Sequence, residues 1–447
     1  MNKFLELREA YPSIVYDSFE ISLRDDTISV SYSFIQSVDI IYKPVIKFFK
    51  CSDITTAKLN KLKTIFFNLG MIELVSYYKA CCSPRIIINC GTLTESQKAF
   101  WKKMFLNGLG EFLFTNSIRI PEDELFDFEC TSLNIYLPDE TKLSASALIP
   151  VGGGKDSVVT LELLKDTDAC PFILNPIPAS ERSVRIAGYK NFIRAERRID
   201  PLLLELNSKG FLNGHTPFSA LLAFVTATAA LIHGKKHIVL SNEGSANEGN
   251  TVYEGININH QYSKTIEAEN DIRNYFKNHI NKELNYFSLL RPLNELKIAA
   301  LFSRFKKHYK SFRSCNAGGR DDRWCRKCPK CLFTYIILSP FINSAELQSI
   351  FGSDLYSDSS LERTFLQLTG FEGIKPFECV GTYSEIRAAL EKAIEISGGK
   401  DLPYLLSLYK KLYLNNKNRN EFEKLLQSYD SNNFLEDSFK KILRCSL

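Results

Sequence analysis

Residues 148–157 read Leu-Ile-Pro-Val-Gly-Gly-Gly-Lys-Asp-Ser, a hydrophobic run that enters a turn of three glycines. An apolar pattern with helical spacing follows directly, with Val158, Val159 and Leu161 at its start. Glycines let the backbone turn tightly and bring amide groups close to anionic oxygens, and the N-terminus of the following helix adds a positive dipole end. The stretch therefore predicts a phosphate-binding turn between a strand and a helix. A glycine-rich turn without a ligand, in any α/β domain, is the alternative.

This turn differs from the nucleotide-hydrolysing P-loop, in which Lys directly precedes Ser or Thr. Here Asp156 stands between the lysine and the serine. Residues 152–157 resemble instead the PP-loop of ATP pyrophosphatases, whose pattern is Ser-Gly-Gly-x-Asp-Ser, except that glycine replaces the leading serine. The resemblance implies cleavage of ATP between its α and β phosphates and adenylation of a substrate. The residues expected to hold the nucleotide are Gly152, Gly153, Gly154, Lys155 and Ser157, with Lys155, Asp156 and Ser157 also expected in catalysis.

The composition is that of a folded protein of two or three domains. The 447 residues are 45% hydrophobic and 24% charged, with a net charge of +5. We expect no contact with a membrane and a cytoplasmic location, because neither a long uncharged apolar stretch nor a signal-peptide core is recognisable. The twelve cysteines are then expected to be thiols or metal ligands rather than disulfides.

Positive charge is concentrated in one segment. Residues 304–330 contain ten Lys and Arg against two Asp, an excess larger than the net charge of the whole chain. Such a segment suits a polyphosphate, a nucleotide-sugar diphosphate or a nucleic-acid backbone. A solvated helix face is the alternative for residues 304–310.

The hydrophobic pattern divides the chain into three parts. Residues 1–145 predict an α+β accessory domain that binds substrate, with strands at 27–34 and 39–49 and helices at 53–68 and 94–107. Residues 146–340 predict a parallel sheet with helices on both faces, with strands at 146–151, 171–175 and 237–241 and helices at 156–166, 180–197 and 217–233. Residues 341–447 predict a mainly helical region that includes a helix at 383–396.

Polar residues follow two of these strands. Ligands of parallel sheets bind beyond the carboxyl ends of the strands, so the glycine turn and the loop at 241–250 are expected to face one crevice. Glu243 and Glu248 in that loop are candidates for a magnesium ligand or a base, and a surface turn is the alternative. Asn175 and Asn242 are candidates for cofactor contacts at the same strand ends.

The strongest metal signal is Cys325-x-x-Cys328-x-x-Cys331, with Cys315 ten positions before Cys325. Four thiolates at such spacing suit a structural zinc ion. An iron–sulfur cluster uses the same ligands, and reduced thiols without a metal are a further alternative. The remaining cysteines show no ligand spacing and are expected to fill space in cores: Cys51, Cys81, Cys82, Cys90, Cys130, Cys170, Cys379 and Cys445.

Histidines carry little signal. His215 precedes a long apolar helix and is expected to cap it, with contact to a ligand as the alternative. The other histidines show no paired metal spacing and receive no role.

Several segments together resemble the ATP-dependent UDP-N-acetylmuramoyl-L-alanyl-L-glutamate epimerases of the MurL type. They are residues 151–157, 241–243 with 248–250, and 324–331 with 333–334, joined upstream by 76–80 and 108–112. The resemblance spans about residues 70–385. It implies a parallel-sheet, HUP-like PP-loop core and inversion of the terminal glutamate of a peptidoglycan precursor, with ATP, Mg²⁺ and structural Zn²⁺ as cofactors. The small UDP-sugar dipeptide would be the substrate, and Lys79 is a weaker candidate for contact with its anionic groups.

The implied chemistry is coherent. The α-proton beside a free carboxylate is hard to remove because the product would be a dianion. Adenylation neutralises the carboxylate, after which a base removes the proton and an acid returns one on the other face. Remote binding energy from the UDP-sugar would position the glutamate.

Three other functions stay open. Enzymes that make 7-cyano-7-deazaguanine share the glycine loop and the cysteine cluster but lack some 145 residues before the loop. RNA-thiolating enzymes would use the basic segment, although nucleic acid is not the partner that we favour. A non-catalytic nucleotide-binding module gains support from Gly152 in place of serine. The oligomeric state and the base that removes the proton are left open.

Overall fold

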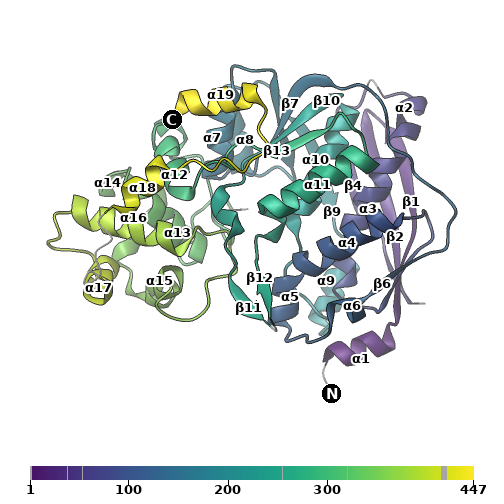
Figure 1. Ribbon diagram of the computed structural model, residues 1–447, viewed down its shortest axis with the longest axis horizontal. Helices are drawn as coiled ribbons and strands as arrows, with labels where there is room; N and C mark the ends of the chain where they lie inside the picture. Colours follow the sequence, from purple (N-terminus) through teal and green to yellow (C-terminus); the bar gives the residue numbers. More distant parts are fainter. Residues whose placement is uncertain (1–2, 38, 53, 254, 320, 414–419) are drawn as a thin grey trace.

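The computed structural model describes residues 3–37, 39–52, 54–253, 255–319, 321–413 and 420–447, which build an α/β fold around one large mixed sheet (Figure 1). The sheet has eleven strands in the order β13-β10-β7-β8-β9-β4-β2-β1-β5-β6, with β3 beside β2. A separate hairpin joins β11 (Thr251–Tyr253) to β12 (Ile256–Ile258).

Five parallel strands form one half of this sheet. They are β7 (Ser144–Pro150), β8 (Ala169–Leu174), β9 (Ile193–Arg198), β10 (Lys235–Leu240) and β13 (Asn285–Ser288). The chain runs outward from β7 through β8 to β9 and then returns to place β10 on the other side of β7. The order of strands therefore reverses between β7 and β10, the place where α/β sheets bind ligands.

The N-terminal strands extend the same sheet. They are β1 (Ser13–Arg24), β2 (Thr27–Gln36), β3 (Ile40–Tyr42), β4 (Val45–Phe48), β5 (Arg85–Ile88) and β6 (Asp127–Cys130). Strand β4 pairs antiparallel with β9, so the sheet is continuous across residue 145, where the sequence predicts a domain boundary. Residues of β2 alternate between buried and half-buried, as expected of a strand that is covered mainly on one face.

Helices cover the sheet in two groups. One hydrophobic core lies between the sheet and α3 (Lys63–Tyr78), α4 (Glu95–Gly108), α10 (Phe218–Ile232) and α11 (Ile266–His279). A second core joins the parallel strands to α7 (Lys155–Leu164), α8 (Pro178–Ala187) and α12 (Glu295–Ser303). Strands β7, β8, β10 and β13 are thus buried from both sides over most of their length, which accounts for their apolar runs, whereas β9 carries charged residues that are exposed or half-buried.

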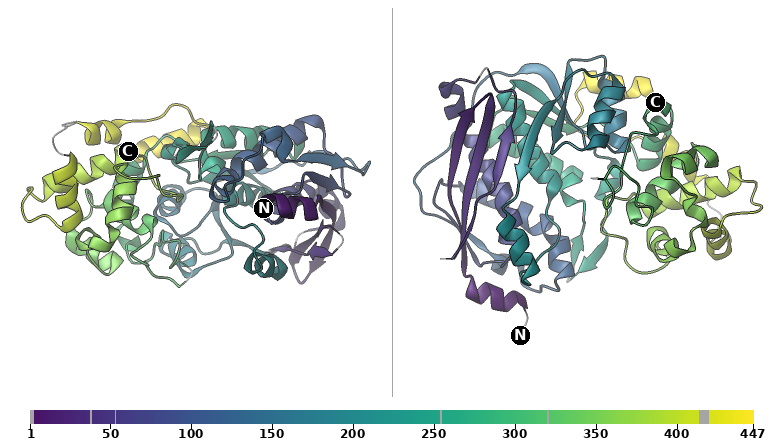
Figure 2. Two further views of the ribbon diagram at one scale, coloured as in Figure 1. Left: turned by 90° about the horizontal axis from the view of Figure 1, so that it is seen from below. Right: turned by 180° about the vertical axis from the view of Figure 1, so that it is seen from behind.

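The C-terminal helices gather at the end of the molecule opposite the N-terminal strands (Figures 1 and 2). They are α13 (Pro329–Leu338), α14 (Ser344–Phe351), α15 (Glu362–Thr369), α16 (Tyr383–Ile396), α17 (Tyr404–Tyr413) and α18 (Glu421–Gln427). The last helix, α19 (Asp437–Ser446), returns to α7. The shorter helices are α1 (Lys3–Ala10), α2 (Thr56–Lys61), α5 (Gly110–Thr115), α6 (Glu122–Leu125) and α9 (Pro201–Ser208). Among the described helices, none combines the length and apolar character needed to span a bilayer.

One predicted helix is wrong over its second half. The sequence predicts a helix over 180–197, but α8 ends at Ala187, and residues 193–198 form β9. Gly188 ends the helix because its φ of +101° is a left-handed conformation that glycine adopts without strain. Ile193 and Ala195 then point to the buried face, where β9 pairs with β8 and β4.

Candidate active site

The glycine turn after β7 depends on Gly153. Its φ is +87°, and a Cβ on it would lie 2.7 Å from the backbone nitrogen of Ser180 in α8. Gly154 is the N-cap of α7, and Ser157 donates its hydroxyl hydrogen bond back to the carbonyl of Gly154 at 3.0 Å. At Gly152, by contrast, a Cβ would meet no atom within 4 Å. The turn thus places backbone amides and the N-terminus of α7 at the end of β7, an arrangement suited to anions.

Three carboxylates converge where neighbouring parallel strands end. Asp156 lies in the first turn of α7 after β7, Glu243 follows β10, and Glu295 is the first residue of α12 after β13. One oxygen from each lies within 4.8 Å of the other two, and we call these three residues the acid cluster. The expected proximity of the glycine turn and the loop after residue 240 is therefore confirmed.

Lys155 is the cation of the acid cluster. Its buried ammonium forms ion pairs with Asp156 and Glu295. Burial opposes the charge of Lys155, but these carboxylates outweigh it and raise the pKa of the lysine. Burial also raises the pKa of Glu295, and three neighbouring carboxylates raise it further against the opposing charge of Lys155: Asp156, Glu243 and Glu385. The acid cluster would therefore gain from a further cation, and carboxylate oxygens suit Mg²⁺.

The loop that carries Glu243 is held from beneath. The fully buried guanidinium of Arg291 donates to the carbonyl of Glu243 at 2.6 Å and to the carboxylate of Glu269 at 2.8 Å. Ser288, the last residue of β13, donates its hydroxyl to the carbonyl of Asn242 at 2.6 Å. These bonds fix the backbone on which the carboxylate of Glu243 is presented.

Two further predicted site residues, Glu248 and Asn175, have their partners outside the acid cluster. The carboxylate of Glu248 pairs with Lys375 at 2.8 Å. The side chain of Asn175 both donates to and accepts from the backbone of Arg197, at 3.2 and 2.8 Å, which joins the end of β8 to β9. Asn175 has a φ of +51°, a conformation that asparagine tolerates better than most residues. These hydrogen bonds give Asn175 a structural role at the carboxyl ends of β8 and β9.

Glu295 is absent from the residues singled out in the sequence, although a signal for it exists. It follows the apolar run of β13 and the N-cap Asn294, whose side chain accepts from the amide of Lys297 at 2.9 Å. Had residues 285–288 been recognised as a fifth parallel strand, the acid at the start of the next helix would have been an expected site residue.

The four predicted metal-ligating cysteines come together. Their sulfur atoms all lie within 4.8 Å of one another, with separations of 3.9 Å for Cys315–Cys328, 3.7 Å for Cys325–Cys331 and 3.5 Å for Cys328–Cys331. A tetrahedral site with Zn–S bonds of about 2.3 Å separates its sulfurs by about 3.8 Å. The sulfur positions thus fit a single zinc ion, whose presence stays a prediction.

The cysteine site is linked to the glycine turn. Arg313, two residues before Cys315, donates its amide to the carbonyl of Gly153 at 2.8 Å. The guanidinium of Arg313 donates to the carbonyl of Asp322 at 3.1 Å, and Asp322 also pairs with Arg182 of α8. The loop between Cys315 and Cys325 is therefore connected to Gly153 of the glycine turn through Arg313, and to α8 through Arg182.

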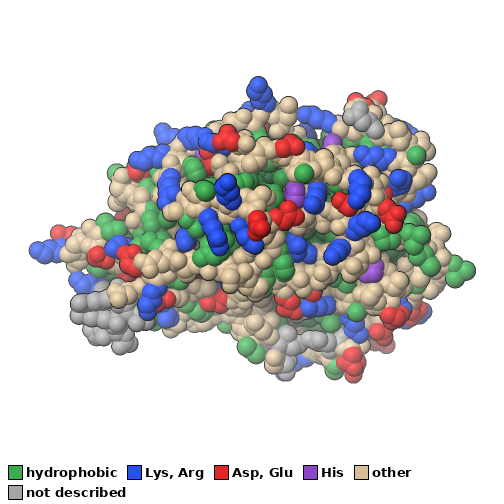
Figure 3. Space-filling view, turned by 45° about the horizontal axis from the view of Figure 1, so that its top comes forward, with side chains coloured by type: hydrophobic (Ala, Val, Ile, Leu, Met, Phe, Trp, Pro, Cys, Tyr) green, Lys and Arg blue, Asp and Glu red, His purple; other side chains and the backbone are tan. Residues whose placement is uncertain are grey.

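Part of the basic segment is neutralised by the fold. Lys307 and His308 both reach Glu162 of α7, at 2.9 and 2.7 Å, and Lys306 pairs with Glu346 at 3.7 Å. On the face drawn in Figure 3, Lys and Arg side chains are interspersed with acidic ones rather than gathered in one patch. Two residues of the basic segment, Lys307 and His308, therefore bind the segment to α7 through Glu162.

A second group of titratable side chains lies apart from the acid cluster. Glu111 of α5 hydrogen-bonds His260 and lies 3.4 Å from His215, and the two imidazole rings have centroids 4.3 Å apart. His215 does not cap α10 as expected, because the N-cap is Pro217 and no side chain bonds there. Lys79 donates to the carbonyl of Gly214 beside this group, and burial lowers the pKa of its ammonium to about 8.

Cys379 departs from the expectation that cysteines outside the metal site only fill space. Its sulfur lies 3.2 Å from the ammonium of Lys264 and interacts electrostatically with His260. No ligand spacing in the sequence marks this residue, since Lys264 and His260 are more than a hundred positions away.

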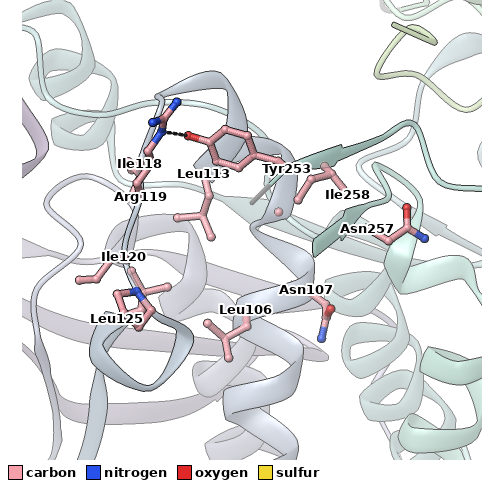
Figure 4. Close-up of a pocket in the computed structure, with 12 residues that line it drawn as sticks. Leu106, Asn107, Leu113, Ile118, Arg119, Ile120, Leu125, Tyr253, Asn257 and Ile258 are labelled. Carbon is pink, nitrogen blue, oxygen red and sulfur yellow. Dashed lines mark hydrogen bonds between the residues drawn. The ribbon is translucent and has the colours of Figure 1, made fainter. Parts of the chain in front are cut away.

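A mainly apolar cavity with a volume of about 400 Å³ lies apart from the acid cluster (Figure 4). It lies between α4 and α5, the segment at 118–125 and the β11–β12 hairpin, and Arg119 donates to the hydroxyl of Tyr253 at 3.4 Å on its wall. None of the acid cluster lines it. However, Gly110 and Ile258 do, and they stand one and two residues from Glu111 and His260.

Known proteins match most of the chain. The MurL N-terminal domain matches residues 6–289, and the MurL C-terminal domain matches residues 310–423. Curated relatives named UDP-N-acetyl-alpha-D-muramoyl-L-alanyl-L-glutamate epimerase occur in Salinispora tropica, Micromonospora sp. and Xanthomonas oryzae pv. oryzae. They are 38%, 36% and 34% identical to this chain, over 76%, 80% and 72% of it and 75%, 80% and 72% of their own lengths. No solved structure matches. The two domain matches and the identity to these relatives show that the chain belongs to the MurL family.

Proposed function

We propose that this protein inverts the terminal L-glutamate of UDP-N-acetylmuramoyl-L-alanyl-L-glutamate to D-glutamate and consumes ATP to AMP and pyrophosphate. The family and the names of its curated members support the epimerisation. The observation that carries the ATP-dependent form is the acid cluster with Lys155 beside a glycine turn at a helix N-terminus. Adenylation requires both kinds of group: backbone amides that bind the phosphate oxygens, and carboxylates that bind a metal ion.

The chemistry explains why ATP is used. Removing the α-proton of a free glutamate carboxylate would create two negative charges on one carbon framework. Attack of that carboxylate on the α-phosphate of ATP forms an acyl-adenylate and releases pyrophosphate. The acyl-adenylate carbonyl can accept the electron pair left by the departing α-proton. A proton then adds to the opposite face of the α-carbon and restores the acyl-adenylate with inverted configuration. Water cleaves this acyl-adenylate and releases AMP with the inverted product.

Individual residues have separate roles in this proposal. Amides at Gly153 and Gly154 and the hydroxyl of Ser157 would bind the leaving phosphates. Asp156, Glu243 and Glu295 would hold Mg²⁺, which supplies charge neutralisation at the phosphates. Lys155 would keep the carboxylates in place, because it is buried and paired with two of them.

The cysteine site and the apolar cavity would support the reaction from outside. We propose that zinc on the four cysteines rigidifies the loop that bonds Gly153, so its role is structural. The cavity next to Glu111 and His260 offers a place for a part of the substrate remote from the glutamate. Binding energy gained there would position the reacting carbon.

The decisive experiment combines the purified protein with ATP, Mg²⁺ and UDP-N-acetylmuramoyl-L-alanyl-L-glutamate in deuterium oxide. We expect AMP and pyrophosphate, accumulation of D-glutamyl product by chiral analysis, and deuterium at the glutamyl α-carbon by mass spectrometry. The L-aspartyl analogue is the matched substrate control.

Other outcomes of this experiment would support different functions. ADP and phosphate as main products would remove the PP-loop chemistry. AMP without deuterium at the α-carbon would retain adenylation and favour an amidating or thiolating enzyme. Tight binding of ATP without release of pyrophosphate would favour a non-catalytic nucleotide-binding module.

A further inference from the structure

Cys379 lies at the centre of a chain of polar contacts. Its sulfur accepts a hydrogen bond from the ammonium of Lys264 at 3.2 Å. His260 also acts electrostatically on this sulfur, and its imidazole is hydrogen-bonded to the carboxylate of Glu111. A cysteine that only fills a core is surrounded by apolar groups, so this arrangement needs another explanation.

The segment that carries Cys379 runs directly to the acid cluster. Two residues later, a Cβ on Gly381 would lie 3.2 Å from Cγ of Glu295 and 2.8 Å from the carboxylate of Glu385. Glu385 in turn accepts the amide hydrogen of Glu295 at 2.7 Å. Cys379 is therefore two residues from a backbone that packs against the acid cluster.

Lys264 joins the two groups electrostatically. Lys264 is half-buried, and the negative charges that act on its ammonium come from Cys379, Glu243 and Asp156. Arg291, which holds the loop of Glu243, also donates to the carbonyl of Lys264. Lys264 thus contacts the sulfur of Cys379 and interacts electrostatically with two carboxylates of the acid cluster.

The charges around Cys379 favour its thiolate. Burial raises the pKa of the thiol, but Lys264, Lys330 and His260 outweigh burial and lower the pKa to about 6. The acid that faces it is its neighbour Glu378, whose own pKa burial raises to about 7. A thiol with a pKa near 6 is deprotonated at neutral pH and can act as a general base.

We propose that Cys379 is the base that removes the glutamyl α-proton, with His260 and Glu111 as positioning residues. This inference rests on the proposed epimerase function. The Cα–H bond breaks, its proton passes to the sulfur, and its electron pair moves into the carbonyl of the acyl-adenylate to form an enolate. A proton that originates from solvent adds to the opposite face, and the thiol then releases its proton to solvent.

The test separates proton transfer from adenylation. Cys379→Ser and Cys379→Ala are compared with wild type and with Cys445→Ser, a change at an exposed cysteine of α19. AMP release and D-glutamyl formation are measured in deuterium oxide, and thermal unfolding verifies the fold. We expect both Cys379 variants to release AMP at a rate close to wild type and to form D-glutamyl product at least about 100-fold more slowly, the contribution typical of a general base.

Two results would overturn this inference while the epimerase function stands. One is D-glutamyl formation at the wild-type rate in either Cys379 variant. The other is equal loss of AMP release and epimerisation in folded variants, which would place Cys379 in adenylation. If wild type itself forms no D-glutamyl product, the proposed function fails first and this inference fails with it.

A second variant decides the matter even if the Cys379 variants do not fold. The rate of epimerisation by wild type should fall as the pH drops through about 6, because the thiolate becomes protonated. His260→Gln removes a positive charge from beside the sulfur and should move this decline to higher pH, whereas the pH profile of AMP release should not move. A decline at unchanged pH would contradict the role of Cys379.

Discussion

Lys155 and Glu295 are 140 positions apart and form one buried ion pair. The sequence shows one partner because the glycine turn marks it, whereas Glu295 gains its role only when β13 is placed beside β10. Cys379 is harder still to predict, since its partners come from a loop and a helix remote in the chain. At the scale of residues, sequence patterns reveal local motifs, and the contacts that complete the site depend on tertiary structure.

Glu295→Gln tests the acid cluster. The amide keeps the size of the side chain but removes one negative charge from the site expected to bind a metal ion. We expect AMP formation to fall by about 100-fold, the scale of losing one preorganised contact to developing charge. Glu248→Gln is the control, because Glu248 pairs with Lys375 outside the cluster. This variant should have a lower unfolding temperature but release AMP at a rate close to wild type. Equal rates in Glu295→Gln and wild type would contradict the assignment.

Gly152 and Gly153 should respond differently to substitution. Gly152→Ser restores the leading serine of the PP-loop pattern, and the structure leaves room for it, so the variant should keep the wild-type free energy of unfolding. Gly153→Ala should lose at least about 1–2 kcal/mol of stability from its positive φ alone, and the approach to Ser180 adds a clash. Urea unfolding of both variants measures this. Equal stabilities would show that the turn is less constrained than its geometry indicates.

His260 links stability to pH. Burial lowers the pKa of His260, but its interactions with Cys379 and Glu111 outweigh burial and raise the pKa to about 9. An unfolded histidine titrates near about 6.5, so the raised pKa stabilises the fold fully below that pH and its contribution is lost as the pH rises through 9. The difference in unfolding free energy between wild type and His260→Gln should therefore shrink between these limits by at most about 3 kcal/mol. Urea unfolding across this pH range, with His279→Gln as control, is the measurement, and a difference that grows with pH would refute the shift.

At the scale of elements, local signals work where one signal dominates. The helix at 383–396 is predicted from its apolar spacing, and α16 has the same bounds with a capping box at Thr382. The helix predicted over 180–197 fails beyond Gly188 because β9 is short and charged, and its strand conformation comes from pairing with β8 and β4. Tertiary pairing outweighs propensity there.

The cysteine loop is the element most dependent on a ligand. We expect one zinc ion per chain by elemental analysis. Its removal by a strong chelator should lower both the unfolding temperature and the affinity for ATP, since the loop bonds Gly153 through Arg313. Cys328→Ser should behave like the metal-free protein, and Cys445→Ser should not. Stoichiometric iron, or a metal-free protein of full stability, would contradict the zinc assignment.

At the scale of the whole molecule, three of the five parallel strands were predictable, because β7, β8 and β10 follow clear apolar runs, whereas β9 and β13 were not predicted. The position of the N-terminal part was not, because residues 1–145 carry no motif that says which edge of the sheet they meet. The structure joins β4 to β9, and it packs α3 against α10 in one core. What the sequence presents as an accessory part thus supplies strands and core to the part that holds the glycine turn.

This shared core predicts the behaviour of fragments. A fragment of residues 146–447 would leave the apolar face of α10 without α3 and the edge of β9 without β4, although it retains the glycine turn and the cysteine site. Exposed apolar surface and an unpaired strand edge favour aggregation, so we expect the fragment alone to be insoluble or to unfold without cooperativity. Co-expression with residues 1–145 should restore a soluble complex that binds ATP. Circular dichroism during heating and calorimetric titration with ATP measure both properties. A fragment that unfolds cooperatively and binds ATP on its own would show that the parallel half is an independent domain.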